Sequence, residues 1–334
     1  MATTESRTAV DHALAEFHRY RAEYGGGLSS HGPMVVESLE HAGLEEHVSG
    51  WTTSYVSRLE PAEPAAPRLE ARLRPGKDAP EAWSASFATE LAHRAWPEVV
   101  AAWAPTLVPG SVGAAGHGIL RAAHAVRSLG RRESPERLAE LAHGLGYWAA
   151  SSFVLPGREA SGTSTLSDAL DRVPLTQSSA FLISERVADI DGRAFGPAVA
   201  AGALPGDADD ALTAVVDLAL RVLLANPDSA IAFIHAVTVP CCARHLLPFV
   251  DEAGGLSVAN QAWWVLAALW SVYARNPPVV DAPTEAPEWA DLLAAALRNG
   301  DEHAIKLTVA AQDQIDRVDE LLLRSAVARV VTAG

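Results

Sequence analysis

The chain has 334 residues, of which 49% are hydrophobic and 20% are charged, and its formal net charge is −15. This hydrophobic share is enough for a substantial core, and the composition argues against long disordered segments. The negative charge argues against binding to nucleic acid and to anionic membrane surfaces, because both are recognised by basic patches. A neutral or hydrophobic small molecule is compatible with this charge.

No segment is predicted to cross a membrane or to act as a signal peptide. The most apolar runs, such as 211–225, are interrupted by polar and charged residues at helical spacing. The first residues lack a basic start followed by an apolar centre. The two cysteines, Cys241 and Cys242, are adjacent, and neighbouring cysteines rarely bridge each other. We therefore expect a cytoplasmic protein with reduced thiols.

Helical periodicity dominates the first third of the chain. One apolar stripe predicts a first helix that ends at the three glycines 25–27. The stripe consists of Val10, Leu14, Phe17, Tyr20 and Tyr24. A second helix is expected to begin after His31-Gly32-Pro33, with the proline near its first turn. Five prolines between residues 61 and 80 predict a loop.

The middle of the chain continues this pattern. Apolar spacing from Trp83 to Trp103 predicts helical structure with a break at Pro97. A turn is expected at 109–110, and helices are expected over 116–129 and 134–153. Ser134 followed by a proline is a favourable start for the second of these. Residues 156–168 are predicted to form a loop.

The last third predicts five more helices. They are expected over 207–225, from about 229 onward, and over 261–275, 289–298 and 301–331. No segment shows the sustained alternation of a strand ladder, and no repeat of fixed period is present. No low-complexity linker is long enough to separate two domains. The sequence therefore predicts an all-α protein with a single helical domain over 1–334.

Several common catalytic motifs are absent. The glycine-containing segment 113–118 (Gly-Ala-Ala-Gly-His-Gly) does not follow a predicted strand, so it does not fit a dinucleotide-binding loop. The sequence also lacks a phosphate-binding loop, HExxH, CxxC and the Gly-x-Ser-x-Gly elbow of esterases. These absences disfavour flavin enzymes, nucleotide hydrolases and serine hydrolases.

The twelve histidines divide by their surroundings. Five lie among charged and polar neighbours and are predicted to be surface residues: His12, His18, His41, His47 and His93. The surroundings of His143 and His245 are ambiguous. The remaining five lie at a helix junction or in apolar segments: His31, His117, His124, His235 and His303.

Two interpretations of these five histidines remain open from the residues alone. Each can be a core histidine with a hydrogen-bond partner, which is the common case for a buried polar group. Alternatively, histidines from separate helices can converge on a metal ion, since helical bundles often build metal sites this way. His117 and His124 are seven residues apart and so share one helix face.

Lys306 follows His303 by nearly one helical turn, between two apolar residues. A lysine in such a place usually extends its amine to solvent. If it is buried instead, burial lowers the pKa and leaves a free amine. A free amine can take up carbon dioxide, and the resulting carbamate binds metal as a carboxylate does.

At these residues the sequence resembles the questin oxidase-like family, and the resemblance runs over most of the chain. Four short segments carry it, in the same order as in the family: Ser30-His31-Gly32-Pro33-Met34, then 117–125 (His-Gly-Ile-Leu-Arg-Ala-Ala-His-Ala), 233–238 (Phe-Ile-His-Ala-Val-Thr) and 303–308 (His-Ala-Ile-Lys-Leu-Thr).

The resemblance implies an oxygenase that uses dioxygen. Fungal members of the family oxidise anthraquinones and related aromatic polyketides, by a Baeyer-Villiger-like step with NADPH or by ring cleavage at a non-haem iron. It implies Fe(II) as the cofactor, with NADPH as a cosubstrate of the first type of reaction. The implied metal ligands in this chain are His31, His117, His235, His303 and a carboxylated Lys306.

Other residues are assigned roles beside these ligands. His124 is expected to lie near the ligands or the substrate and to accept a phenol proton, because a histidine with a pKa near neutrality suits that step. Arg121, Tyr147 and Trp148 are expected to orient or stack on a planar substrate. This sequence is shorter than the fungal sequences and differs from them after His117, so the resemblance does not fix the exact substrate or the type of reaction.

Two alternatives of other classes remain. One is a cofactor-independent oxygenase without a metal, in which histidines deprotonate an electron-rich substrate that then reacts with dioxygen. The other is a non-catalytic helical protein that binds an aromatic ligand or a partner. Oligomeric state and NADPH dependence cannot be read from the residues.

Overall fold

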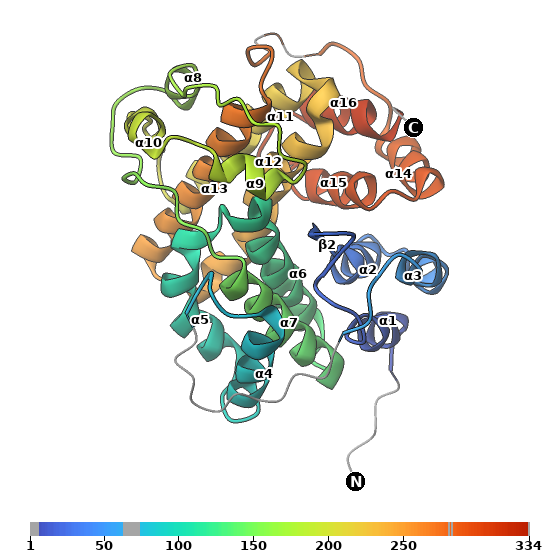
Figure 1. Ribbon diagram of the computed structural model, residues 1–334. Coiled ribbons are helices and arrows are strands. Elements are labelled where there is room, and N and C mark those ends of the chain that lie inside the picture. The colour runs from blue at the N-terminus through green and yellow to red at the C-terminus, as the bar shows by residue number, and fades with distance from the viewer. Residues whose placement is uncertain (1–6, 63–73, 280, 282, 333–334) are drawn as a thin grey trace.

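The computed structural model describes residues 7–62, 74–279, 281 and 283–332. Within these ranges the chain forms sixteen α-helices, several short 3-10 turns and one two-stranded hairpin (Figure 1). The helices are α1 (Ala9–Phe17), α2 (Gly32–His41), α3 (Val48–Val56), α4 (Pro80–Leu91), α5 (Trp96–Leu107), α6 (His117–Arg131), α7 (Pro135–Ala150), α8 (Leu166–Leu170), α9 (Ile183–Ala188), α10 (Gly192–Ala200), α11 (Ala208–Ala225), α12 (Ala230–Ala243), α13 (Glu252–Tyr273), α14 (Trp289–Asn299), α15 (Glu302–Gln312) and α16 (Glu320–Val331). The prediction of an all-α protein is confirmed.

The first helix is shorter than its apolar stripe predicted. Helix α1 ends at Phe17, and the two tyrosines that extended the stripe lie outside it. Tyr20 bridges to Pro61, while Tyr24 lies in strand β1 (Glu23–Tyr24), which pairs with β2 (Leu28–Ser29). The three glycines between these strands all have positive φ, so they form the turn of the hairpin rather than a helix cap.

Several predicted helix starts are confirmed by their caps. Pro33 lies in the first turn of α2, and Pro97 lies in the first turn of α5 after the predicted break. The Ser134 side chain accepts from the backbone N–H of Arg137 at the start of α7. Asp207 caps α11 in the same way through two backbone N–H groups.

Other boundaries were wrong. The predicted helix over 301–331 is two helices, α15 and α16, because the chain leaves helical structure after Gln312 and restarts behind the cap Asp319. Helix α13 begins nine residues before the predicted start, capped by Asp251. The predicted loop over 156–168 ends at α8, and the short helices α3, α9 and α10 were not predicted. Of the predicted loop over 61–80, residues 63–73 lie outside the described ranges.

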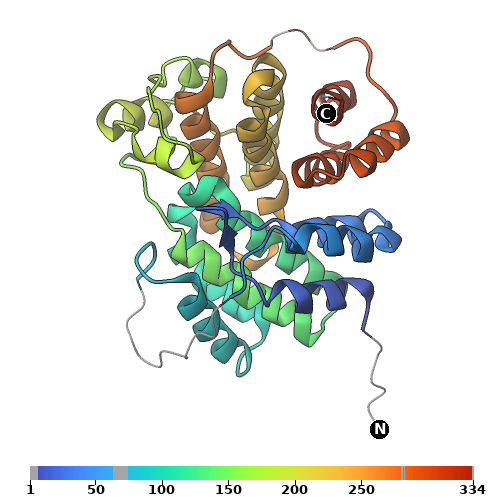
Figure 2. The same cartoon turned by 45° about the vertical axis from the view of Figure 1, so that its right-hand side comes forward.

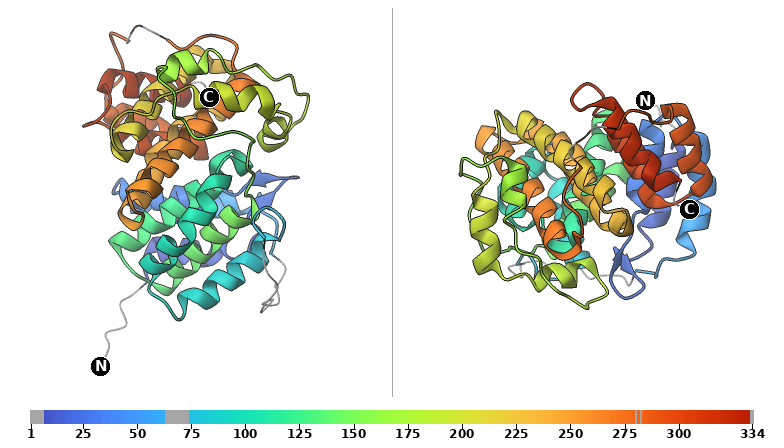
Figure 3. Two further views of the ribbon diagram at one scale, coloured as in Figure 1. Left: turned by 90° about the vertical axis from the view of Figure 1, so that its left-hand side faces the viewer. Right: turned by 90° about the horizontal axis from the view of Figure 1, so that it is seen from above.

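The helices form one domain with two tiers. Figures 1 and 3 show α4, α5 and α7 at one end of the molecule and α8 to α16 at the other, with α6 running between them. Figure 2 shows the helices of the first sixty residues directly beneath the C-terminal helices, and α2 indeed packs against α15. Helices from the N-terminal and C-terminal parts of the described chain therefore meet at the centre of the domain.

Four of these helices form a ring. Helix α2 packs against α6 and α15, and α12 packs against the same two helices from the opposite side. All four run parallel, since residues early in each helix contact one another and later residues do the same. His117 on α6 contacts His235 on α12, and seven residues later His124 contacts Cys242. The start of each helix, or in α12 its second turn, therefore lies at the same end of the ring.

One helical run, Pro227–Phe249, is long and apolar enough to cross a membrane, with a mean hydropathy of 1.5. It contains α12, and 72% of its apolar 18-residue window is buried inside the protein. Its apolar surface is therefore covered by neighbouring helices, as expected of a core helix. Residues 211–225 were the example of an apolar run given from the sequence, and a cytoplasmic location stays a prediction.

Candidate metal centre

Three histidines from three helices meet at the end of the ring where these helices begin. His31 caps α2, His117 is the first residue of α6, and His235 lies in the second turn of α12. The Nε2 atom of His117 lies 2.6 Å from that of His31 and 3.0 Å from that of His235. All three side chains are buried. The structure therefore brings together residues that are 86 and 118 positions apart in the sequence.

The backbone fixes the tautomer of two of these rings. His117 donates from Nδ1 to the carbonyl of Ala114 at 2.5 Å, and His235 donates from Nδ1 to the carbonyl of Ile231 at 2.8 Å. A neutral imidazole with its proton on Nδ1 carries a lone pair on Nε2. Two lone pairs 3.0 Å apart repel each other unless a cation or a proton lies between them. Metal-ligating histidines commonly have this orientation, with the other ring nitrogen donating to a carbonyl.

A strained turn places the carbonyl that orients His117. Ala114 and Ala115 have φ values of 46° and 55°, and Gly116 follows with a φ of 83°. Alanine rarely adopts positive φ, and such strain often occurs at functional sites. Gly116 is also required for space, because a Cβ there would lie 2.5 Å from a methyl group of Val239 on α12. The segment 113–118 is thus a support for His117, and no strand leads directly into it, because the element before it is the 3-10 turn Val108–Gly110.

The three rings are neutral at physiological pH. Burial, reinforced by the nearby charge of Lys306, lowers the pKa of His117 to about 3. Burial and the neighbouring rings hold the pKa values of His31 and His235 well below the usual range for histidine. Helices α2, α6 and α15 begin here, and the positive ends of their dipoles also disfavour protonated rings. A neutral imidazole is the form that binds a metal ion.

His303 and Glu302 occupy the neighbouring side of this cluster, at the start of α15. The ring of His303 lies 4.6 Å from that of His31 and 5.4 Å from that of His235, between centroids. A carboxylate oxygen of Glu302 and ring nitrogens of His31 and His303 all lie within 4.8 Å of one another. The described residues therefore contain two overlapping donor groups that share His31 and could hold a metal ion.

Sequence reasoning did not identify Glu302. The signal that could have found it is its place directly before His303, in the first turn of a helix that carries a proposed ligand. The Glu302 side chain is buried, with 9% of it exposed, and its carboxylate accepts a hydrogen bond from Arg58 at 2.9 Å. A buried carboxylate beside two imidazoles adds an oxygen donor to the site.

Lys306 is buried close to the same rings, as its effect on the pKa values of His31 and His117 shows. Its side chain is 2% exposed, and no described residue makes an ion pair or a hydrogen bond with its amine. Burial lowers the pKa of this amine to about 8. The amine therefore does not extend to solvent, and a larger fraction of it is uncharged near neutral pH than for an exposed lysine, although the protonated form still predominates.

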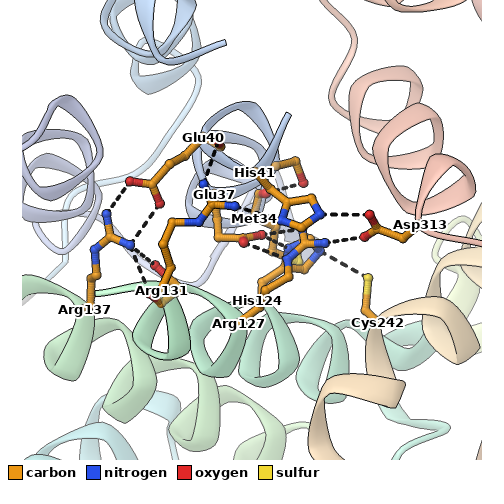
Figure 4. A network of polar contacts seen from close by, with 12 residues as sticks. Met34, Glu37, Glu40, His41, His124, Arg127, Arg131, Arg137, Cys242 and Asp313 are labelled. Atoms are coloured by element: carbon orange, nitrogen blue, oxygen red, sulfur yellow. Dashed lines mark hydrogen bonds and ion pairs between the residues drawn. The ribbon is translucent and has the colours of Figure 1, made fainter. Parts of the chain in front are cut away.

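His124 lies two turns along α6, below the cluster. Its Nδ1 is 2.6 Å from a carboxylate oxygen of Glu37, and its Nε2 is 3.5 Å from the sulfur of Cys242 (Figure 4). Burial opposes the charged form of this ring, but Cys242 and Glu37 outweigh burial and raise its pKa. Both ring nitrogens are thus engaged by protein groups, which leaves no free nitrogen to accept a phenol proton. The predicted catalytic role of His124 stays a prediction.

The other residues expected at the substrate have structural partners instead. Arg121 donates to both oxygens of Glu140, at 2.7 and 2.9 Å, and this pair is buried. Tyr147 donates to Glu23 and contacts Ser29 through the same hydroxyl. Trp148 is 1% exposed and donates to Ser111. Such partners satisfy these polar groups within the protein, so the catalytic role predicted for Arg121 also stays a prediction.

The remaining histidines agree only in part with the prediction of surface residues. His12, His47 and His93 are exposed as predicted. His18 and His41 are half-buried, and they pair with Glu140 and Asp313 at 3.0 and 2.8 Å. His18 also stacks on His143. Charged neighbours in the sequence therefore did not predict exposure, because each partner comes from a distant helix.

Comparison of this chain with protein-family models, with curated proteins and with solved structures gives no match. The geometry of the cluster and the four sequence motifs are therefore the grounds on which a function can be argued.

Proposed function

We propose that this protein is a metal-dependent oxygenase that acts with dioxygen on an aromatic polyketide or anthraquinone-like molecule. The observation that carries the proposal is the pair of facing Nε2 atoms of His117 and His235, 3.0 Å apart. Both nitrogens carry lone pairs because both Nδ1 protons are donated to backbone carbonyls. A metal ion between them removes this repulsion, and the depressed pKa values argue against a proton in its place.

The donor set fits Fe(II). Imidazole nitrogens suit iron as well as zinc and copper, and an added carboxylate oxygen favours iron over sites built from thiolates. His31, His303 and Glu302 supply two imidazoles and one carboxylate, the combination typical of non-haem Fe(II) oxygenases. His117 and His235 would complete the set of four histidines that the family resemblance implies. When bound, Fe(II) supplies the electrons that activate dioxygen.

Lys306 would supply a second anionic donor. Its uncharged amine attacks the carbon of carbon dioxide, forms a nitrogen–carbon bond and releases one proton, which leaves a carbamate. The helix N-termini that converge on the cluster stabilise such an anion. The carbamate would then lie among the four histidines with an oxygen available for the metal.

NADPH enters the proposal only through the family resemblance. The glycine-containing segment 113–118 forms the turn that supports His117, so it is not available to hold a dinucleotide. We therefore place NADPH as an optional cosubstrate of a Baeyer-Villiger-like reaction, and ring cleavage as the reaction that does not require it.

The experiment that tests the proposal is elemental mass spectrometry of protein purified without added metal or chelator. We expect close to one iron per chain, because the cluster is buried and its ligands are preorganised. His117→Ala should reduce the metal to less than a tenth of this value. His93→Ala, which alters an exposed histidine on the opposite tier, is the matched control and should retain it.

Other outcomes identify the alternatives. Folded protein that contains no metal but consumes dioxygen with a hydroxyanthraquinone would contradict the proposed metal dependence and favour a cofactor-independent oxygenase. Protein that binds the aromatic compound without consuming dioxygen would favour a non-catalytic binding protein. Stoichiometric zinc would keep the site and contradict the redox chemistry.

A further inference from the structure

A polar cavity of about 560 Å³ opens directly beside the candidate metal centre. It lies between α3 and the turn that joins α14 to α15, two segments that are adjacent in Figure 1. Its volume falls within the range of about 300–1,000 Å³ that is usual for small-molecule sites.

Two of its lining residues connect this cavity to the cluster. Tyr55 accepts a hydrogen bond through its hydroxyl from the backbone N–H of His31, at 2.8 Å. Glu302 contributes a carboxylate that lies within 4.8 Å of ring nitrogens of His31 and His303. His303 is also the one histidine of the four that is not fully buried, with 14% of its side chain exposed. A molecule in the cavity would therefore lie against the accessible side of the cluster.

The wall formed by α3 has an aromatic and a cationic part. Trp51 stacks on Tyr55, with centroids 4.6 Å apart and ring planes at 17°. The guanidinium of Arg58 lies over the same tyrosine ring at 4.4 Å, so Tyr55 is covered by both neighbours. Trp51 is half-buried and lines the cavity, and its indole N–H is fixed by the carbonyl of Gly300 at 3.0 Å. Aromatic rings of this kind favour stacked planar partners.

The charges of the cavity argue for a neutral ligand. Arg58 is the only cation among the lining residues and pairs with the carboxylate of Glu302, while Asp301 adds a second carboxylate to the lining. The excess of one negative charge disfavours a ligand that carries a carboxylate or a phosphate. Carboxylates accept from hydroxyl donors, while the guanidinium donates to a carbonyl oxygen.

We propose that this cavity is the substrate-binding pocket and that it takes a neutral, planar, polyhydroxylated aromatic molecule with a ring carbonyl. Trp51 stacks on the ring system, Asp301 accepts from ligand hydroxyl groups, and Arg58 donates to the carbonyl. Arg58 and Trp51 are thus specificity-determining residues. This inference deepens the proposed function and rests on it for the class of substrate.

Isothermal titration calorimetry without dioxygen tests the proposal. The probes are a neutral dihydroxyanthraquinone and its carboxylated analogue, added to the purified protein. We expect the neutral compound to bind at least about tenfold more tightly than the carboxylated one. Arg58→Met and Trp51→Leu should each weaken binding of the neutral compound by about tenfold or more. Circular dichroism and the thermal midpoint establish that each variant is folded.

A matched control comes from a second, more apolar cavity of about 690 Å³, lined in part by Leu166, Ala214 and Leu218. Ala214→Phe fills part of this second cavity and should leave binding unchanged. Loss of binding in Ala214→Phe with full binding in the folded Arg58→Met variant would overturn the assignment. Equal affinity for the two probes, or no binding of either, would overturn it as well.

The two proposals fail in different ways. Metal content is measured separately, so a metal-free protein that binds the neutral probe through Arg58 contradicts the oxygenase and supports the pocket. If the protein contains iron and consumes dioxygen, but its affinity for the neutral probe does not change in the Arg58 and Trp51 variants, the result supports the oxygenase function and contradicts the assignment of the pocket.

Discussion

At the scale of single residues, the candidate site depends on how each side chain is held by its own helix. His235 donates to a carbonyl four residues earlier, and His117 donates to a carbonyl three residues earlier. These local bonds turn both Nε2 atoms toward the centre before any ligand is bound. Lys306 differs because it has no described partner, so its burial is unfavourable unless a reaction or a metal uses it.

Replacement of Lys306 separates its chemistry from its packing. Lys306→Met keeps most of the buried volume and removes the amine, so the fold should be retained. We expect oxygen consumption with a hydroxyanthraquinone to fall by at least about a hundredfold, which corresponds to about 2.7 kcal/mol of transition-state stabilisation. A second readout is the ¹³C NMR signal of a carbamate after addition of labelled bicarbonate, which the variant should lack. Unchanged turnover would exclude the carbamate from the reaction.

The depressed pKa of His117 gives a pH dependence of stability. In the folded protein this pKa is about 3, compared with about 6.5 for a free histidine. Between these values the unfolded chain binds one more proton at this residue, so stability falls as the pH falls. In His117→Gln, the loss of stability in acid should be smaller by about 1.4 kcal/mol per pH unit.

Urea denaturation in the presence of a chelator measures this difference, between about pH 4 and about pH 5.5. The chelator removes the contribution of metal release from both proteins. Parallel plots of unfolding free energy against pH for the two proteins would contradict the assignment of a neutral, buried ring to His117.

At the scale of elements, glycines set how closely α6 approaches α7. A Cβ on Gly118 would lie 2.5 Å from the Cα of Trp148, and a Cβ on Gly144 would lie 3.1 Å from the Cα of Ala122. The two helices therefore pack backbone against backbone. Because His117 precedes Gly118 in the same turn, this packing also sets the position of the His117 ring.

Two glycine substitutions on the same helix test this close packing. Gly118→Ala forces α6 away from α7 and should lower the free energy of unfolding by about 1–3 kcal/mol, with reduced metal retention. Gly130→Ala is the matched control, because nothing lies within 4 Å of its Cβ position. It should raise stability by about 0.5 kcal/mol and leave the metal content unchanged. Equal effects of the two substitutions would show that the contact between α6 and α7 does not limit the site.

At the scale of the whole molecule, a charged network ties α2 and the end of α15 to α6 at the centre (Figure 4). Arg127 on α6 donates to both oxygens of Glu37 on α2, and to Asp313 at the end of α15. Asp313 in turn contacts His41. Burial opposes the charge on Glu37, but Arg127 and His124 outweigh it and hold the pKa of this carboxyl well below its usual range.

Removal of Arg127 should therefore destabilise the whole domain. Arg127→Met leaves the buried Glu37 carboxylate without its main partner, and we expect a loss of about 3–5 kcal/mol in unfolding free energy. Arg94→Met removes an ion pair at the protein surface near the end of α4 and should lower the unfolding free energy by about 0–1 kcal/mol. Chemical denaturation at neutral pH measures both. A loss for Arg127→Met as small as that for Arg94→Met would show that α2, α6 and α15 do not depend on this network.

The helices were largely predictable because they depend on nearby residues. Ser134 and Asp207 cap helices through N–H groups within three residues of themselves, and Pro33 and Pro97 lie where proline favours a helix start. The prediction failed where distant partners decided the outcome. Tyr20 and Tyr24 fit a helical stripe, but they pair with Pro61 and with the other strand of the hairpin. His18 and His41 looked exposed, but acidic residues from distant helices cover them.

The sequence by itself determined the all-helical fold, most of the helix starts, and which histidines and which lysine are candidate metal ligands. Only the tertiary structure decided which of them meet. His31, His117, His235 and His303 converge because α2, α6, α12 and α15 run parallel in one ring, with long segments of chain between them. The same packing placed Glu302 beside the cluster and directed His124 and Arg121 to Glu37 and Glu140. Helix formation depends on neighbours along the chain, whereas convergence of side chains depends on contacts between distant helices, which spacing does not encode.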